Sequence, residues 1–243
     1  MQTRIRAILS ELRSHAPFTL FGAGTGIMAM LLFANTSTEV SQRLFQVFHP
    51  SHVVLSAIVT ASLFRLHEMR RGFLAVVLVG YLGSVGTATL SDCILPFYGE
   101  SILGVAVPTE AKVHGHAGDH EMADEHEAES GKPQIHLGFI EDWYLVNPAA
   151  LLGVLIAWFW PRTKFPHAGH ILISTWASSF HILMNTHREL SPMLLLGSFV
   201  VLFIAVWLPC CFSDIVFPMF FVRSPHLHLE HHYDHHTQEE AQT

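Results

Sequence analysis

The chain has 243 residues, of which 50% are hydrophobic and 14% are charged, and its mean hydropathy is +0.37. Soluble domains carry roughly 25% charged residues, so this composition excludes an ordinary soluble domain. The net charge of -7 comes largely from one loop and the C-terminal tail, and it gives no reason to expect nucleic-acid binding. The sequence therefore predicts an all-α protein, a polytopic helix bundle in a lipid bilayer.

Six apolar segments could cross a bilayer, which requires roughly 20 helical residues. They are residues 17–34, 52–66, 72–90, 143–160, 168–184 and 193–212. The first segment has no small-residue cleavage site, which favours an uncleaved helix over a signal peptide. Residues 36–48 are predicted to be a polar, partly amphipathic connector. Residues 93–107 are apolar but contain Pro96 and Gly99, so they could be re-entrant, interfacial or a seventh span.

Basic residues indicate the orientation of these segments. If there are six spans, these basic residues lie on the same side of the membrane: Arg4, Arg6, Arg13, Arg65, Arg70, Arg71, Arg162, Lys164 and Arg223. An excess of arginine and lysine marks the cytoplasmic side, whereas seven spans would break this agreement. We therefore predict six spans in the cell (inner) membrane with both termini in the cytoplasm. The sequence is also compatible with a homo-oligomer.

The second half of the chain repeats polar motifs of the first half in the same order. His49-x-x-His52-x-x-x-Ser56 is matched by His167-x-x-His170-x-x-x-Ser174, and Ser91-Asp92-x-x-x-Pro96 is matched by Ser213-Asp214-x-x-x-Pro218. Histidine is abundant, so chance could produce one match, but the shared order favours a duplication. Each half has three spans, so the second copy would be inverted, as in many secondary transporters. This 3+3 repeat predicts that His52 and His170 lie at opposite faces of one bundle.

The predicted organisation has four parts. Residues 1–108 form the first three-helix repeat, 109–135 an acidic histidine-rich loop, 136–222 the second three-helix repeat, and 223–243 a histidine-rich cytoplasmic tail. Histidine-rich tracts bind metals loosely, although the loop could also be a solvated linker. The auxiliary metal ligands expected here are His114, His116, His120, His126, His136, His226, His228, His231, His232, His235 and His236.

Two predicted helices carry a polar stripe on one face. One stripe comprises His52, Ser56, Thr60 and His67, and the other comprises His167, His170, Ser174, Ser178, His181 and Asn185. In hydrocarbon each unsatisfied polar group costs on the order of a few kcal/mol, so both faces should point into the bundle. The hydroxyl groups could instead bond only to their own helices. Small residues at 80, 83, 84 and 86 should let a neighbouring helix approach closely.

Histidine and carboxylate side chains are ligands for borderline divalent ions such as Zn²⁺, Ni²⁺ and Co²⁺. We predict two sets of metal ligands, one near each membrane face, with His181 between them. The outer set is His49, His52 and Asp92, which Glu100, His136, Glu141 or Asp142 could join, and the inner set is His167, His170 and Asp214. Because the ordinary pKa of histidine is about 6.5, protons would compete with metal near neutral pH.

The function predicted from these features is transport or export of a divalent transition metal, with proton coupling available. The ligand chemistry favours zinc as the ion. A membrane-embedded zinc hydrolase is the first alternative, with Asp92 or Glu100 as general base. Against it, the chain has no H-E-x-x-H or G-x-S-x-G motif. A metal-sensing partner subunit is the second alternative. The three cysteines, at positions 93, 210 and 211, are interpreted as small buried hydrophobic residues and not as a disulfide framework.

Overall fold

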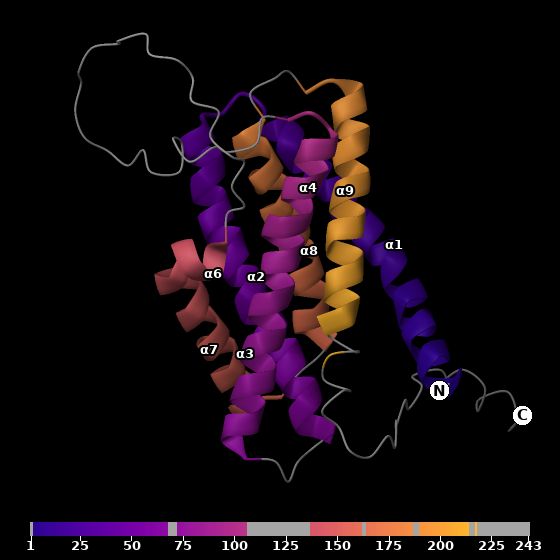
Figure 1. Cartoon of the computed structure of the whole chain (residues 1–243), viewed down its shortest axis with the longest axis vertical. Helices are drawn as coiled ribbons and strands as arrows, with labels where there is room; N and C mark the ends of the chain where they lie inside the picture. The colour runs from indigo at the N-terminus through magenta and orange to yellow at the C-terminus, as the bar shows by residue number, and fades with distance from the viewer. Residues whose placement is uncertain are drawn as a thin grey trace, which may run out of the picture.

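A computed structural model of the chain describes residues 2–67, 72–105, 137–161, 164–186, 190–213 and Phe217. All regular structure within these ranges is helical, which confirms the predicted all-α class (Figure 1). Four described stretches are long and apolar enough to cross a membrane, namely His15–Leu32, Thr38–Leu66, Phe73–Ile102 and Pro192–Cys211. Helix α7 (Trp143–Phe159) is apolar but shorter. The predicted loop and tail lie outside the described residues.

Helix α1 (Gln2–Leu32) is followed by a helix that is much longer than predicted. Helix α2 extends from Thr38 to His67, so the expected polar connector at 36–48 is wrong. Phe45, Leu44 and Phe48 lie in this first part of α2 and pack against Phe180 and its neighbours. Burial of this aromatic face stabilises helical structure that the local polar composition does not favour. As a result, His49 and His52 lie in the middle of a helix and not at its start.

The predicted end of the third span at Ser91 and Asp92 is also wrong. Helix α3 (Phe73–Thr89), the π-helical turn η1 (Leu90–Ile94) and helix α4 (Leu95–Ile102) form one continuous stretch of 30 residues. The backbone N–H of Leu95 bonds to the carbonyl of Leu90 across this wide turn. The missing N–H of Pro96 falls just after it, in the first turn of α4, where a helix tolerates proline. Residues 93–102 are therefore part of the same helix as Phe73.

The second half contains the short helix α6 (Gly138–Glu141), α7, α8 (Lys164–Asn185) and α9 (Pro192–Cys211). Helix α9 begins within one residue of its predicted start. Its first turn is capped by the hydroxyl of Ser191, which accepts a hydrogen bond of 3.2 Å from the N–H of Leu194. Helix α8 begins four residues earlier than predicted, at Lys164 instead of residue 168.

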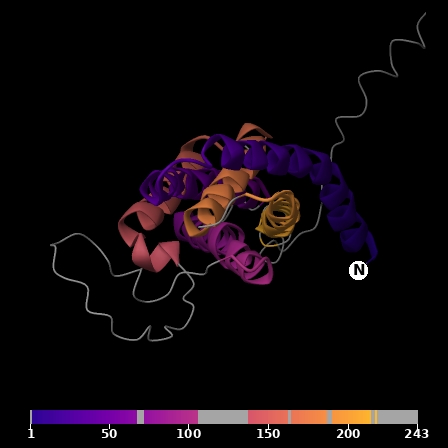
Figure 2. The same cartoon turned by 90° about the horizontal axis from the view of Figure 1, so that it is seen from above.

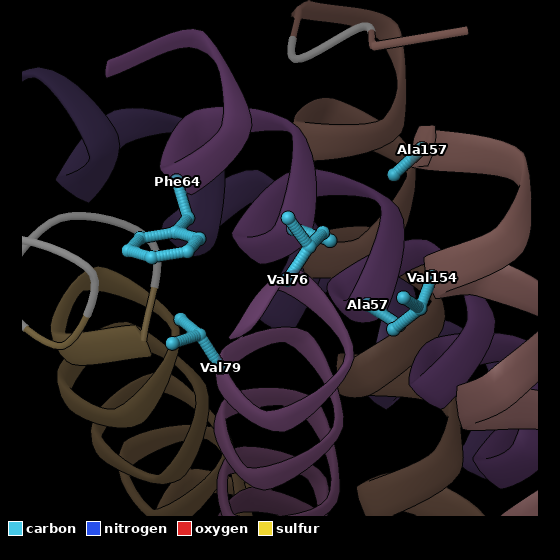
Figure 3. Packing of buried hydrophobic residues seen from close by; sticks show 7 residues of the cluster. Ala57, Phe64, Val76, Val79, Val154 and Ala157 are labelled. Carbon is cyan, nitrogen blue, oxygen red and sulfur yellow. The ribbon is translucent and has the colours of Figure 1, made fainter. Parts of the chain in front are cut away.

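Helices α2 and α8 occupy the centre of the bundle. Helix α2 packs against α3, α7 and α8, and α8 also packs against α1 and α9. Seen from above, α7 lies towards one end of the bundle and α1 towards the other (Figure 2). One apolar cluster joins α2, α3 and α7 and contains Ala57, Ala61, Phe64, Val76, Val79, Val154 and Ala157 (Figure 3). These contacts leave the polar stripes of α2 and α8 to face other parts of the interior.

Small residues bring the helices close together, as predicted for the third span. A Cβ added at Gly80 would lie 2.8 Å from the Cβ of Ala61, and one at Gly83 would lie 2.7 Å from Thr60 Cγ2. Contacts between real Cβ atoms and neighbouring atoms are longer, so α2 and α3 can approach this closely only where one side chain is absent. Helix α7 approaches α2 in the same way through Gly153.

We expect Gly153→Ala to lower the free energy of unfolding by about 1–3 kcal/mol, because the new methyl group overpacks the α2–α7 contact. It would meet the carbonyl oxygen of Val54 and lie 2.7 Å from the Cβ of Ala57. Gly86→Ala is the matched control, since no described atom lies within 4 Å of its added Cβ. The measurement is unfolding in detergent for both variants, and equal stability of the two would contradict this packing.

Candidate metal centre

The carboxylate of Asp92 is the centre of a buried polar cluster. Its Oδ2 atom lies 2.9 Å from Nδ1 of His49 and 2.8 Å from Nδ1 of His52. The two histidines are three residues apart on α2, so they share one face and reach the same oxygen. All three side chains are buried. The structure therefore brings together the three residues predicted for the outer set.

The other carboxylate oxygen of Asp92 faces hydroxyl groups. Its Oδ1 atom accepts hydrogen bonds from Ser91 at 2.7 Å and from Ser174 at 2.8 Å. Ser178 donates to the carbonyl of Ser91 at 3.0 Å and to that of Ser174 at 2.9 Å. The wide turn η1 is thus bonded to α8 as well as to α2. Both oxygens of Asp92 are already occupied, which makes this residue a partner that orients the histidines.

The Nε2 atoms of these histidines remain available for another partner. We infer that Nδ1 carries the ring proton and donates to Asp92, because a carboxylate only accepts. Nε2 then holds the lone pair in both rings. Among the described residues, Nε2 of His49 and Nε2 of His52 are buried with no hydrogen-bond partner. Nε2 of His49 faces Gly138 of α6, where an added Cβ would lie only 2.6 Å away.

His52 and His170 lie next to each other and not at opposite faces of the bundle. Their rings are stacked, with centroids 5.6 Å apart and planes 6° from parallel. The prediction of opposite faces placed each histidine at the start of its helix. Because His52 lies near the middle of α2 and both polar stripes face inward, the two side chains meet in the interior. The geometric expectation drawn from the inverted repeat is therefore wrong.

A cysteine completes this group. His52, His170 and Cys210 each offer one ligand atom, and these atoms all lie within 4.8 Å of one another. Cys210 is on α9, where it packs with Ile171 and Val206. All three cysteines are reduced and buried, as predicted, but the position of Cys210 beside two histidines was not predicted. No spacing relates Cys210 to either histidine, and only the fold brings them together.

A second polar cluster lies between α4 and α8. Glu100 Oε1 lies 2.7 Å from Nδ1 of His181, and Glu100 Oε2 accepts a hydrogen bond of 2.9 Å from the amide of Asn185. Nε2 of His181 has no hydrogen-bond partner among the described residues. Phe45 separates the two clusters, because its ring stacks on His49 at 5.1 Å and contacts His181 edge-on at 5.5 Å. Glu100 thus pairs with His181 and does not join Asp92.

The polar stripes face the interior as predicted. Ser56, Thr60, Ser174 and Ser178 are all buried, and the Thr60 hydroxyl lies 3.1 Å from that of Ser213. Some hydroxyls bond to their own helix as well, which agrees with the simpler interpretation of these residues.

The remaining predicted ligands do not join these clusters or lie outside the described residues. Asp142 is buried and lies 3.5 Å from the amide of Gln46, whereas Glu141 is exposed. The side chain of His167, together with Asp214, His136 and the histidines of the loop and tail, lies outside the described residues. Of the predicted inner set, the structure therefore describes only His170.

Comparisons with models of protein families, with curated proteins and with solved structures find no match for this chain. The class of protein therefore follows from the described fold and site alone. The protein is helical, with four helices suited to a membrane, and its interior holds two histidine–carboxylate clusters. One further group, formed by two histidines and a cysteine, could hold a metal ion.

Proposed function

We propose that this protein is a multi-pass membrane transporter or exporter of a divalent transition-metal ion of the zinc, nickel or cobalt class. One observation carries the proposal. His49, His52 and His181 are buried, each has Nδ1 against a carboxylate, and each has an Nε2 atom without a hydrogen-bond partner among the described residues. Metal-binding histidines commonly use one nitrogen for the ion and the other for a carboxylate that orients the ring.

The energetic cost of these unpartnered nitrogens supports the same function. A buried donor or acceptor that is left unsatisfied costs about 1–3 kcal/mol, so three such nitrogens are a considerable burden on stability. Bound metal would satisfy the nitrogens that it contacts. Ionisable residues inside a membrane commonly mark ion paths, and His49, His52 and both carboxylates lie on helices suited to a membrane. Because metal and protons compete for histidine nitrogen, exchange of metal for protons is the coupling that we propose.

The proposal includes six spans in an inverted 3+3 arrangement in the cell (inner) membrane. Helix α7, with 17 residues, and α8, with 22 residues and a polar face, would be the two spans beyond the four long apolar helices. The opposite courses of α3 and α9 in Figure 1 support this arrangement, since these helices would be equivalent in the two halves. The basic residues that flank the spans support cytoplasmic termini.

Zinc uptake into sealed liposomes tests the proposal. We expect uptake by the wild type under a proton gradient, and at least a tenfold lower rate for His52→Ala and for His170→Ala. Ser51→Ala is the matched control, because Ser51 lies beside His52 on α2 but, among the described residues, its hydroxyl bonds only to the carbonyl of Val47, at 2.7 Å. This control should transport like the wild type. Nickel and cobalt are measured in the same way.

Two results would contradict this function. Absence of uptake of all three metals by the wild type, under proton gradients of either direction, would exclude transport of this metal class. Loss of uptake only on deletion of residues 109–135 and 223–243, with the two histidine variants unaffected, would place metal binding in the loop and tail.

A further inference from the structure

Three helices each contribute one possible metal ligand to the same place. His52 comes from α2, His170 from α8 and Cys210 from α9, and none of the three side chains is more than 1% exposed. Their ligand atoms lie within 4.8 Å of one another. Zinc bonds of about 2.0–2.3 Å in tetrahedral geometry set neighbouring ligand atoms roughly 3–4 Å apart. Small side-chain adjustments would therefore close this group around one ion.

The orientation of His52 independently indicates a ligand at this position. Asp92 holds Nδ1 of His52 at 2.8 Å, so Nε2 is the nitrogen that remains for a metal. That atom is buried and has no hydrogen-bond partner among the described residues. The parallel stacking of His170 on His52 places the second imidazole beside it. Nε2 of His49, in contrast, faces the backbone of α6 at Gly138.

We propose that His52, His170 and the thiolate of Cys210 bind the transported ion, with a fourth position left open. That the bound ion is also the transported ion rests on the proposed function, whereas the binding itself does not. The thiol S–H bond breaks, a sulfur–metal bond forms, and one proton is released to solvent for each ion bound. A thiolate with two imidazoles favours Zn²⁺ and Co²⁺ over Mg²⁺, Ca²⁺ and Mn²⁺, which prefer oxygen ligands. The open position suits an ion that must leave again.

Cobalt provides a probe that reports sulfur ligation. Co²⁺ bound to a thiolate gives a charge-transfer absorption in the near ultraviolet, and Co²⁺ bound only to histidine and carboxylate groups does not. The histidines of the loop and tail can therefore bind Co²⁺ without contributing to this band. We expect the full chain in detergent to develop the band, to saturate it at one Co²⁺ per chain, and to lose it on addition of Zn²⁺ but not of Mg²⁺.

The cysteines provide their own controls. Cys210→Ser should abolish the band and weaken Zn²⁺ binding at the helical site at least tenfold, whereas Cys211→Ser, at the adjacent buried position, should keep the band. The double variant Cys93→Ser/Cys211→Ser retains Cys210 as the only cysteine of the chain and should give the full band. This variant keeps the test decisive even if Cys210→Ser folds poorly.

The outcomes separate this inference from the proposed function. Absence of the band in the wild type, its persistence in Cys210→Ser, or its loss in the double variant would overturn the assignment of Cys210. Zinc uptake without the band would overturn this inference and leave transport intact. The band without uptake of any metal would support the binding site and overturn the transport proposal.

Discussion

Asp92→Asn is expected to lower zinc affinity and zinc uptake by about 10- to 100-fold while the protein remains folded. The amide has nearly the same shape as the carboxylate, and its oxygen can still accept from Ser91 and Ser174. Its NH₂ group would then face the two histidine Nδ1 atoms. Since an amide nitrogen only donates, both rings would shift their proton to Nε2, and in His52 this is the nitrogen through which we propose that the metal binds.

Ser174→Ala is the control for this prediction. It removes one hydrogen bond from the opposite oxygen of the same carboxylate and leaves Oδ2 in contact with His49 and His52. We expect its zinc affinity to fall much less than that of Asp92→Asn. Calorimetric titration measures the affinities, and ¹⁵N chemical shifts of the histidine rings report the tautomers. Wild-type affinity in Asp92→Asn would show that His52 does not bind the metal through Nε2.

Glu100→Ala is expected to lower the free energy of unfolding by about 2–6 kcal/mol, because it leaves two buried groups without a partner. His181 Nδ1 and the amide of Asn185 both depend on this carboxyl group, at 2.7 and 2.9 Å. Each buried polar group left unsatisfied costs about 1–3 kcal/mol, and the lost side-chain volume adds a cavity. Denaturant unfolding of the full chain in mixed micelles measures the loss.

Glu100→Gln separates hydrogen bonding from volume in this cluster. The glutamine fills the same space and can face His181 and Asn185 with one polar atom each. We therefore expect less than half of the stability loss seen for Glu100→Ala. Equal losses in the two variants would show that the carboxyl group itself, and not the number of satisfied partners, stabilises the contact between α4 and α8.

The helices that could be predicted well are those whose own residues determine them. Helix α9 is almost entirely apolar, so its start was placed within one residue. The predicted span at 52–66 is shorter than helix α2, because the first 14 residues of α2 are largely polar. Packing of Phe45 and Phe48 against α8 explains why these residues are nevertheless helical. Ser91 and Asp92 resemble a helix end, yet here their polar groups are satisfied by His49, His52 and Ser174, which are distant in sequence.

The candidate site likewise contains some residues that could be predicted from the sequence and others that could not. His49, His52 and Asp92 were predictable, because ionisable residues are costly in an apolar segment and two of them share a helix face. The pairing of His52 with His170, and of Glu100 with His181, depends on how α2, α4 and α8 cross. Cys210 was not predictable, since a buried cysteine in an apolar helix has the same pattern whether or not it lies near a ligand.

The two oxygens of Asp92 connect different parts of the chain. Oδ2 faces His49 and His52, which belong to the N-terminal half, and Oδ1 accepts from Ser174 of the C-terminal half. In the proposed transporter, rocking of one half against the other would break the bond to Ser174 and leave both histidine contacts intact. The carboxylate would move with the histidines that it orients, so both Nδ1 atoms would keep their partner, whereas His52 would move relative to His170 and Cys210. In that mechanism, the hydroxyl of Ser174 would bond to Asp92 in only one of the two conformations.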